Sequence, residues 1–200
     1  MDSNALFKIG YGLYVLTARE GEKDNGCIVN TVMQVMPNPA TMVLGVCKQN
    51  YTHDMIARTG EFNVSMLTQE TPFKVFEHFG FQSGKNVNKF ADCEQSFRSE
   101  NGILYLPKYT NAMLSGKVTQ QIDMGSHTLF VADITQAKVL SDVESVTYSY
   151  YQANIKPKPQ ATSVKGWRCK ICGYVYEGEN LPADFICPLC KHGAADFEKI

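Results

Sequence analysis

Two Cys-x-x-Cys pairs near the end of the sequence constrain this chain more than any other feature. They are Cys169-Lys170-Ile171-Cys172 and Cys187-Pro188-Leu189-Cys190, with 14 residues between them. A Cys-x-x-Cys turn lets both sulfurs face one point, so two such turns can supply a tetrahedral set of thiolates. We therefore predict one metal ion bound by Cys169, Cys172, Cys187 and Cys190. By spacing alone, structural zinc and redox-active iron both suit this ligand set.

The residues around the two pairs favour iron. Gly173-Tyr174 follows the first pair, Pro188 lies within the second, and Trp167 and Phe185 add aromatic side chains for a small core. The pattern Trp-x-Cys-x-x-Cys-Gly-Tyr with Cys-Pro-x-Cys resembles that of the rubredoxins, over residues 167–200. This resemblance implies a mononuclear iron centre on the four cysteines. Zinc remains the alternative occupant, particularly in recombinant protein.

Length and composition indicate two domains. Two hundred residues with 44% hydrophobic side chains can bury one core of about 150 residues and a small second one. The stretch around Lys156-Pro157-Lys158-Pro159 is polar and proline-rich, which is typical of a semi-extended linker. We therefore predict a domain over residues 1–151, a linker over 152–165 and a small domain over 166–200.

Charge and hydropathy argue against several classes of partner. The 19 basic and 20 acidic side chains give a formal net charge of −1, so neither nucleic acid nor an anionic membrane is an expected partner. Met1-Asp2-Ser3-Asn4 has no signal-peptide character, and no apolar run reaches the roughly 20 residues of a membrane helix. Cys27, Cys47 and Cys93 form an odd remainder, as expected in a reducing compartment. We expect a cytoplasmic protein in which these three cysteines are small buried side chains.

The first 150 residues are predicted to be mostly β-strands. Val, Ile, Thr, Leu and aromatic residues dominate six segments that are bounded by Gly, Pro, Asn or Asp. These segments are Tyr11–Arg19, Cys27–Met36, Thr41–Lys48, Phe62–Thr68, Ala112–Asp123 and Thr128–Val139. Gly21–Gly26 is expected to form a turn. Closely spaced strands with few helices favour an antiparallel barrel or sandwich over alternating βαβ units.

Two short helices are expected between the strands. Thr52 is predicted to cap a helix that runs to Arg58 and ends near Gly60. Thr71-Pro72 predicts the start of a second helix, which stops at Gly80. The inward face of this second helix is expected to carry Phe73, Phe76 and Phe79.

The transition from the third predicted strand to the first helix offers an anion site. The segment Lys48-Gln49-Asn50-Tyr51-Thr52-His53 places free backbone N–H groups and the helix dipole beside the Lys48 ammonium and the Thr52 hydroxyl. Taken alone, Lys48 can equally be a solvated charge and Thr52 a helix cap. The chain has no Gly-x-Gly-x-x-Gly opening a helix and no phosphate loop, so a Rossmann or P-loop nucleotide domain is not expected.

Residues from about Ala5 to Tyr150 resemble the FMN-binding split-barrel family of flavin reductases and flavoredoxins. The matching segments are Asn30-Thr31 with Met33-Gln34, Lys48–His53, Gly60–Ser65, Phe79–Lys85 and Gly125–Phe130. The resemblance implies a mainly β fold, an FMN-binding split β-barrel with short helices, followed here by the small rubredoxin-like metal-binding domain.

The same resemblance implies roles for individual residues. Those bordering the isoalloxazine ring would be Asn30, Thr31, Met33 and Gln34, and those along the ribityl chain and phosphate would be Thr31, Lys48, Asn50, Thr52 and His53. His127 is implied as the catalytic residue on the nicotinamide side, although Ser126 stands where the family more often has Asp. The alternative for His127 is a histidine at a strand end that bonds a local carbonyl.

Together the two resemblances imply an electron-transfer oxidoreductase similar to the high-molecular-weight rubredoxins of anaerobes. NADH or NADPH would reduce FMN, which would pass single electrons to the four-cysteine iron and on to a protein acceptor, such as a flavodiiron protein. Split barrels of this family close the flavin site with a second subunit, so a homodimer is expected. Two alternatives are a flavin-containing carrier without a nicotinamide site and a flavin reductase with a structural zinc module.

Overall fold

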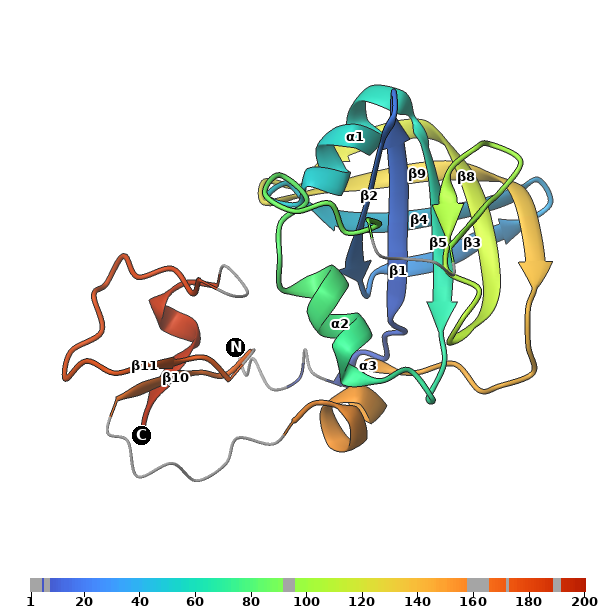
Figure 1. The fold of residues 1–200 in the computed structure, drawn as a ribbon. Helices are drawn as coiled ribbons and strands as arrows, with labels where there is room; N and C mark the ends of the chain where they lie inside the picture. Colours follow the sequence, from blue (N-terminus) through green and yellow to red (C-terminus); the bar gives the residue numbers. More distant parts are fainter. Residues whose placement is uncertain (1–4, 6–7, 92–95, 158–165, 172, 189–191) are drawn as a thin grey trace.

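The computed structural model describes residues 5, 8–91, 96–157, 166–171, 173–188 and 192–200. This part of the chain forms two bodies (Figure 1). The larger body contains strands β1 to β9 and helices α1 to α3, and the smaller contains β10 to β12. Among the described residues, no helix is long and apolar enough to cross a membrane.

One antiparallel sheet of seven strands forms the larger body, in the order β2-β1-β5-β8-β9-β4-β3. Its strands are β1 (Tyr14–Glu20), β2 (Lys23–Val29), β3 (Val32–Pro37), β4 (Ala40–Cys47), β5 (Glu61–Leu67), β8 (Thr110–Asp123) and β9 (His127–Val139). Strands β6 (Phe97–Arg98) and β7 (Leu104–Tyr105) pair separately. Because β2 and β3 are edge strands, the sheet curls without closing, which confirms the predicted split-barrel, mainly β fold.

The predicted strand Cys27–Met36 is wrong as a single element. Strand β2 ends at Val29, and β3 begins at Val32. Strand β2 pairs with β1, whereas β3 pairs with β4, so the chain passes between opposite edges of the sheet within two residues. The β-branched and apolar residues continue through this break, and therefore the local pattern did not indicate it.

The predicted turn over Gly21–Gly26 is too long. Gly21 adopts φ +58°, and Glu20 already pairs with Lys23 across the hairpin. A glycine with positive φ allows this tight connection, because it has no Cβ to clash. Strand β2 therefore extends back over Asp24 and Asn25 despite their turn-like character.

Helices α1 (Tyr51–Thr59) and α2 (Phe73–Gly80) occupy the two predicted positions. Helix α1 ends as predicted at Gly60, whose φ is +72° and whose N–H donates to the Ile56 carbonyl. The prediction that Thr52 caps this helix is wrong. The N-cap is Asn50, and the Thr52 hydroxyl is buried, where it accepts a hydrogen bond from Asn25 at 2.9 Å.

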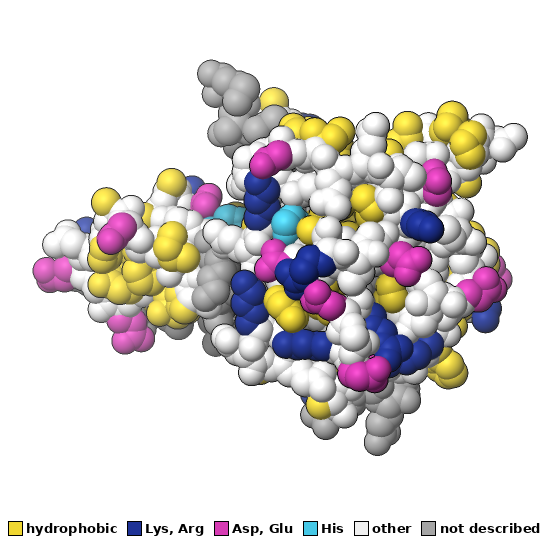
Figure 2. Space-filling view, turned by 90° about the horizontal axis from the view of Figure 1, so that it is seen from above, with side chains coloured by type: hydrophobic (Ala, Val, Ile, Leu, Met, Phe, Trp, Pro, Cys, Tyr) yellow, Lys and Arg dark blue, Asp and Glu magenta, His cyan; other side chains and the backbone are white. Residues whose placement is uncertain are grey.

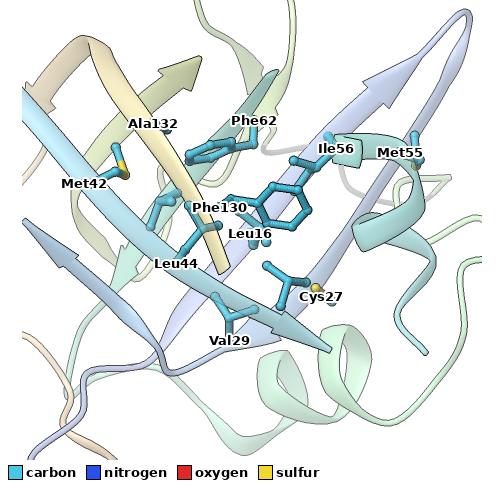
Figure 3. Packing of buried hydrophobic residues seen from close by; sticks show 13 residues of the cluster. Leu16, Cys27, Val29, Met42, Leu44, Met55, Ile56, Phe62, Phe130 and Ala132 are labelled. Carbon is cyan, nitrogen blue, oxygen red and sulfur yellow. The ribbon is translucent and has the colours of Figure 1, made fainter. Parts of the chain in front are cut away.

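The main core fills the concave side of the curved sheet. Phe62, Phe130 and Leu16 are fully buried at its centre and come from three different strands (Figure 3). Phe62 on β5 lies directly opposite Gly116 on β8. A Cβ at Gly116 would overlap the Phe62 ring, and β8 changes register against β9 between Ser115 and Gly116. The ring thus occupies the space of the missing side chain where the sheet bends.

A second apolar cluster joins α2 to the end of the larger body. Phe76 and Phe79 on α2 are buried as predicted, and Phe73 packs against the cluster. Helix α3 (Tyr148–Tyr150) continues into a π-helical turn, Tyr151–Ile155. The Tyr151 ring lies 4.6 Å from the Phe76 ring, centroid to centroid. This packing explains why the start of the predicted linker, residues 152–165, is helical rather than extended.

Lys89 ties the loop after α2 to the sheet. Its side chain is 3% exposed, and its ammonium donates to the carbonyl of Gly26 at 2.8 Å and of Phe79 at 2.9 Å. Burial lowers the pKa of Lys89 below its usual range. The two carbonyls partly offset the cost of burying this charge.

The smaller body is a sheet of three short strands in the order β11-β10-β12. They are β10 (Trp167–Cys169), β11 (Val175–Tyr176) and β12 (Phe197–Lys199). The predicted aromatic residues Trp167, Tyr174 and Phe185 pack together with Tyr176 and Phe197 around Cys169 and Cys187. Residues 158–165 of the predicted linker lie outside the described part of the chain.

Substituting Gly116→Ala should destabilise the protein, because the added methyl group must displace the fully buried Phe62 ring. We expect a loss of about 1–3 kcal/mol in the free energy of unfolding, the usual cost of overpacking. Gly10→Ala is the matched control, since a Cβ at Gly10 meets open space. Urea unfolding followed by circular dichroism measures both, and equal stability of the two variants would contradict this account of the bend.

Substituting Lys89→Met should also lower stability, by about 2 kcal/mol, because buried carbonyl oxygens lose their donor. Lys138→Met, at an exposed position on β9, removes the same charge and should leave the unfolding free energy within about 0.5 kcal/mol of the parent. The same denaturation measurement applies. An undiminished unfolding free energy for Lys89→Met would show that the ammonium does not anchor the loop.

Candidate functional site

A pocket of about 680 Å³ lies where the end of β4 leads into α1. Its walls are the junction of β4 with α1, the loop after α2, and parts of β2 and α3. Its lining includes Cys47, Gln49, Asn50, Tyr51, Thr52, Phe81, Gln82, Ser83, Gly84, His127, Tyr148 and Tyr151. This volume and mixed lining are typical of cofactor and ligand sites.

The junction of β4 and α1 is held by backbone hydrogen bonds. Cys47 pairs with His127 across the sheet, and the Lys48 N–H donates to the Ser126 carbonyl at 3.0 Å. Asn50 then takes extended angles, with φ −74° and ψ 128°, before the first helical residue. The Asn50 N–H donates to the Cys47 carbonyl and the His53 N–H to the Asn50 carbonyl, both at 3.0 Å. The N–H groups of Tyr51 and Thr52 have no acceptor within an ideal helix, so they are the donors that α1 presents, with the positive end of its dipole, at the pocket wall.

Asn25 connects two walls of the pocket, although no sequence pattern marked it. Its amide donates to Thr52 at 2.9 Å, and it is 2% exposed. A Cβ at Gly84 would overlap the same amide, so only glycine allows the loop after α2 to approach so closely. Asn25 was hidden because it lies in a segment predicted to be a turn.

Of the residues predicted to bind flavin or act in catalysis, Asn50, Thr52 and His127 line this pocket. The others lie outside its lining: Asn30, Thr31, Met33, Gln34, Lys48 and His53. Asn30 and Thr31 lie in the connection between β2 and β3, where Thr31 donates to the Asn30 side chain at 3.1 Å. Met33 and Gln34 are exposed on edge strand β3, with Met33 60% exposed.

Lys48 and His53 have partners within the chain. The Lys48 ammonium donates to Asp123 at 2.7 Å, and this hydrogen bond, together with one from the Gly125 N–H, holds the pKa of the Asp123 carboxyl below its usual range. The imidazole of His53 is buried between Asp54, at 3.1 Å, and the Thr128 hydroxyl, at 2.8 Å. A phosphate ligand would therefore have to compete with Asp123 for Lys48.

His127 stands at the start of β9, at the pocket rim. Its side chain is exposed, and its Nδ1 lies 2.9 Å from the Ser126 hydroxyl. This hydrogen-bond partner, Ser126, occupies the position where the resembled family more often has Asp. His127 lines the pocket, while its place beside a nicotinamide and its chemical role stay predictions.

Two of the three unpaired cysteines also lie at the pocket. Cys27 and Cys47 are free thiols that line it. Burial raises the pKa of the Cys27 thiol to about 11, so it remains protonated and unreactive near neutral pH. This agrees with the prediction of a small buried side chain for Cys27, while Cys47 is half-buried. Cys93 lies outside the described residues.

The smaller body carries the candidate metal centre. Cys169 and Cys187 are 1% and 0% exposed, respectively, and both are free of disulfides. The Gly173 N–H donates to the Cys169 carbonyl at 2.8 Å, and the Cys187 N–H donates to the His192 carbonyl at 2.8 Å. Two cysteines on tight turns within one core suit a shared metal ion, because the metal would compensate for buried thiolates. The other predicted ligands, Cys172 and Cys190, lie outside the described residues.

Residues of the smaller body complete the lining of the pocket. They are Ile171, Pro188 and His192. Ile171 lies inside the first Cys-x-x-Cys pair and Pro188 inside the second. The two cysteine turns therefore face the same space as Asn50 and Thr52. Figure 2 shows histidine side chains at and beside the junction of the two bodies, and interspersed acidic and basic side chains on the larger one.

A second hollow, of about 840 Å³, lies on the other side of the loop after α2. Charged residues line it, and two of them, Arg98 and Asp24, form an ion pair at 2.8 Å. Neither His127 nor the described residues of the cysteine turns contribute to its lining. We therefore assign the candidate chemistry to the 680 Å³ pocket.

Two protein-family models match the chain in succession. The model described as "Flavin reductase like domain" matches residues 6–158, and "Rubrerythrin, rubredoxin-like domain" matches residues 167–198. Among solved structures, the NADH:FAD oxidoreductase of Streptomyces globisporus C-1027 is similar with a TM-score of 0.66 and 22% sequence identity. The similarity covers 73% of this chain and 85% of that one.

Curated relatives include proteins of matching length. High molecular weight rubredoxin of Moorella thermoacetica is 35% identical over 100% of both chains. Ferric-chelate reductase (NAD(P)H) of Archaeoglobus fulgidus is 35% identical over 82% of this chain and 96% of its own. The chain therefore belongs to the flavin reductase-like family of oxidoreductases and, as its sequence predicted, carries a rubredoxin-like domain after the flavin reductase-like one.

Proposed function

We propose that this protein transfers electrons from NADH or NADPH, through bound FMN, to a four-cysteine iron centre and on to a protein acceptor such as a flavodiiron protein. The observation that carries the proposal is the single pocket lined by both the β4–α1 junction and the two metal-binding turns. The names of the two curated relatives, a rubredoxin and an NAD(P)H-dependent reductase, support an electron-transfer role and a nicotinamide donor. The free thiols Cys27 and Cys47 agree with a cytoplasmic location.

The residues at the β4–α1 junction support FMN as the flavin. The first turn of α1, with Asn50 as its N-cap, would receive a terminal phosphate through free N–H groups. Thr52 is fixed by Asn25, so its backbone would be preorganised for that contact. Lys48 would exchange its ion pair with Asp123 for the phosphate. The half-buried, mixed walls beside Tyr51 and Phe81 would hold the rest of the cofactor.

Two bound groups would supply the redox chemistry: the flavin would take a hydride from the nicotinamide and release electrons singly, and the iron would accept them one at a time. The protein would contribute positions rather than a nucleophile. His127, oriented by the Ser126 hydroxyl, would position the nicotinamide at the pocket rim. Hydride transfer requires no general acid, so substituting His127 should weaken activity without abolishing it.

A symmetric homodimer is part of the proposal. Strand β3 is an unpaired edge with apolar side chains exposed, since Met33 is 60%, Val35 57% and Met36 40% exposed. Such an edge needs a cover, because it offers both free hydrogen-bonding groups and apolar surface. A second copy of the chain on β3 would bring Asn30, Met33 and Gln34 into a buried site, where the family resemblance expects the flavin ring.

The proposed reaction can be followed by visible absorption spectroscopy. Adding NADH to the purified, iron-loaded holoprotein without oxygen should bleach the flavin bands and then the iron–cysteine bands. In Cys187→Ser, which lacks one thiolate, the flavin should still bleach while the iron bands are absent, and metal analysis should show a loss of bound iron. If neither NADH nor NADPH bleaches the flavin, the protein is a carrier for another donor. Stoichiometric zinc in protein from iron-replete cells would indicate a structural module instead.

The dimer can be tested at the β3 edge. Sedimentation velocity of the parent protein should show a dimer, and Val35→Glu should shift it to monomer, because a charge would be buried in the interface. Val139→Glu is the matched control, since Val139 is an equally apolar residue, 75% exposed, on β9, and this variant should stay dimeric. A parent protein that sediments as a monomer would contradict the proposal.

A further inference from the structure

We propose that the smaller body, here called the metal module, docks on the 680 Å³ pocket of its own chain. Lys156 is the residue that positions it there. This inference rests on the proposed function, because it specifies which pocket the iron serves. The sequence alone leaves transfer within one subunit and transfer between subunits equally open.

The first observation is the direction in which the metal module faces. Ile171 and Pro188 belong to the two cysteine turns, and both line the pocket together with Gln49, Thr52 and Phe81. Each is one or two residues from a metal-ligating cysteine in sequence. The two cysteine turns therefore contribute directly to the pocket wall.

The second observation is a hydrogen bond that joins the two bodies. The Lys156 ammonium donates to the carbonyl of Ile171, inside the first cysteine turn. A hydrogen bond from a charged donor is stronger than one between neutral groups. It also acts at the turn that holds the metal rather than at the far side of the module, so it sets the orientation of the metal centre.

Lys156 is itself fixed to the larger body. Its backbone N–H donates to the Tyr151 carbonyl at 2.8 Å, which ends the π-helical turn. Tyr151 is 7% exposed, lines the pocket, and packs its ring at a tilt against Phe76 of α2. A continuous series of contacts thus runs from α2 through Tyr151 and Lys156 to Ile171.

The length of the connection favours the pocket of the same chain. Nine peptide steps separate Pro157 from Gly166, and such a segment spans at most about 30 Å. A short tether keeps a module near its own pocket at an effective concentration in the millimolar range. One hydrogen bond and a few apolar contacts can therefore hold the docked arrangement, although they would be too weak between free molecules.

The docking can be tested without relying on electron transfer. Unlabelled and ¹⁵N-labelled holoprotein are unfolded together, refolded with metal and flavin, and treated with an amine cross-linker. Mass spectrometry then identifies the peptides that link Lys170 or Lys199 to lysines of the larger body. Docking on the same chain gives linked peptides of one isotope only. Mixed-isotope pairs at the statistical level, or no link between the two bodies, would overturn the proposal.

Lys156→Met tests the positioning role. Loss of a hydrogen bond to a charged group costs about 1.5–3 kcal/mol, so the ratio of docked to undocked module should fall about tenfold or more. The yield of cross-links from Lys170 and the rate of iron bleaching should both fall, while flavin bleaching by NADH should be no slower than in the parent. Lys138→Met should match the parent in all three.

The same measurements separate this proposal from the proposed function. Unchanged cross-linking and iron bleaching in Lys156→Met would refute the role of Lys156 even if NADH reduces both centres. If NADH fails to reduce the iron in the parent protein, the proposed function fails, yet same-chain cross-links that Lys156→Met weakens would still support the docking.

Discussion

The packing of Phe62 over Gly116 sets the curvature on which the rest of the structure depends. A flat sheet of seven strands would keep β4 far from β1 and β2, because β5, β8 and β9 lie between them. Bending at Gly116, where the ring replaces a side chain, wraps the sheet around one core of Phe62, Phe130 and Leu16. This curvature brings the end of β4 opposite β2, and the pocket lies between these two strands, with residues of both in its lining.

Two buried polar side chains then fix the pocket walls. Asn25 joins β2 to α1 through Thr52, and Lys89 joins the loop after α2 to β2 through the Gly26 carbonyl. Buried polar groups are costly unless they are satisfied, and once satisfied they specify one arrangement. The pocket is therefore held open by hydrogen bonds that depend on the bend in the sheet, rather than by the sequence of any single wall.

The sequence predicted the parts of the site whose signal is local. Cysteine spacing indicates two turns that meet in one core, as Cys169 and Cys187 do, while metal binding there stays a prediction. The passage from Val46 to His53 marks the end of a strand beside a helix N-terminus. The roles of Asn25 and Lys89 were not predicted, because their hydrogen-bond partners, Thr52 and Gly26, are 27 and 63 residues away in sequence, respectively. The break after Val29 was missed because the choice between two sheet edges is made by tertiary pairing. Met33 and Gln34 are exposed on edge strand β3 of the single chain, so the roles expected for them stay predictions.

If the proposed function holds, the contact between the two bodies must meet two opposing requirements. The metal module must approach the pocket closely to receive an electron, yet the same pocket must admit a nicotinamide past Ile171 and Pro188, which contribute to its lining. A large apolar interface would satisfy the first demand and prevent the second. A charge-assisted hydrogen bond from Lys156, backed by a short tether, suits both, because it orients the module when docked and exchanges readily with water when it leaves. A reversible contact of this kind would allow one pocket to serve a donor and an acceptor in turn.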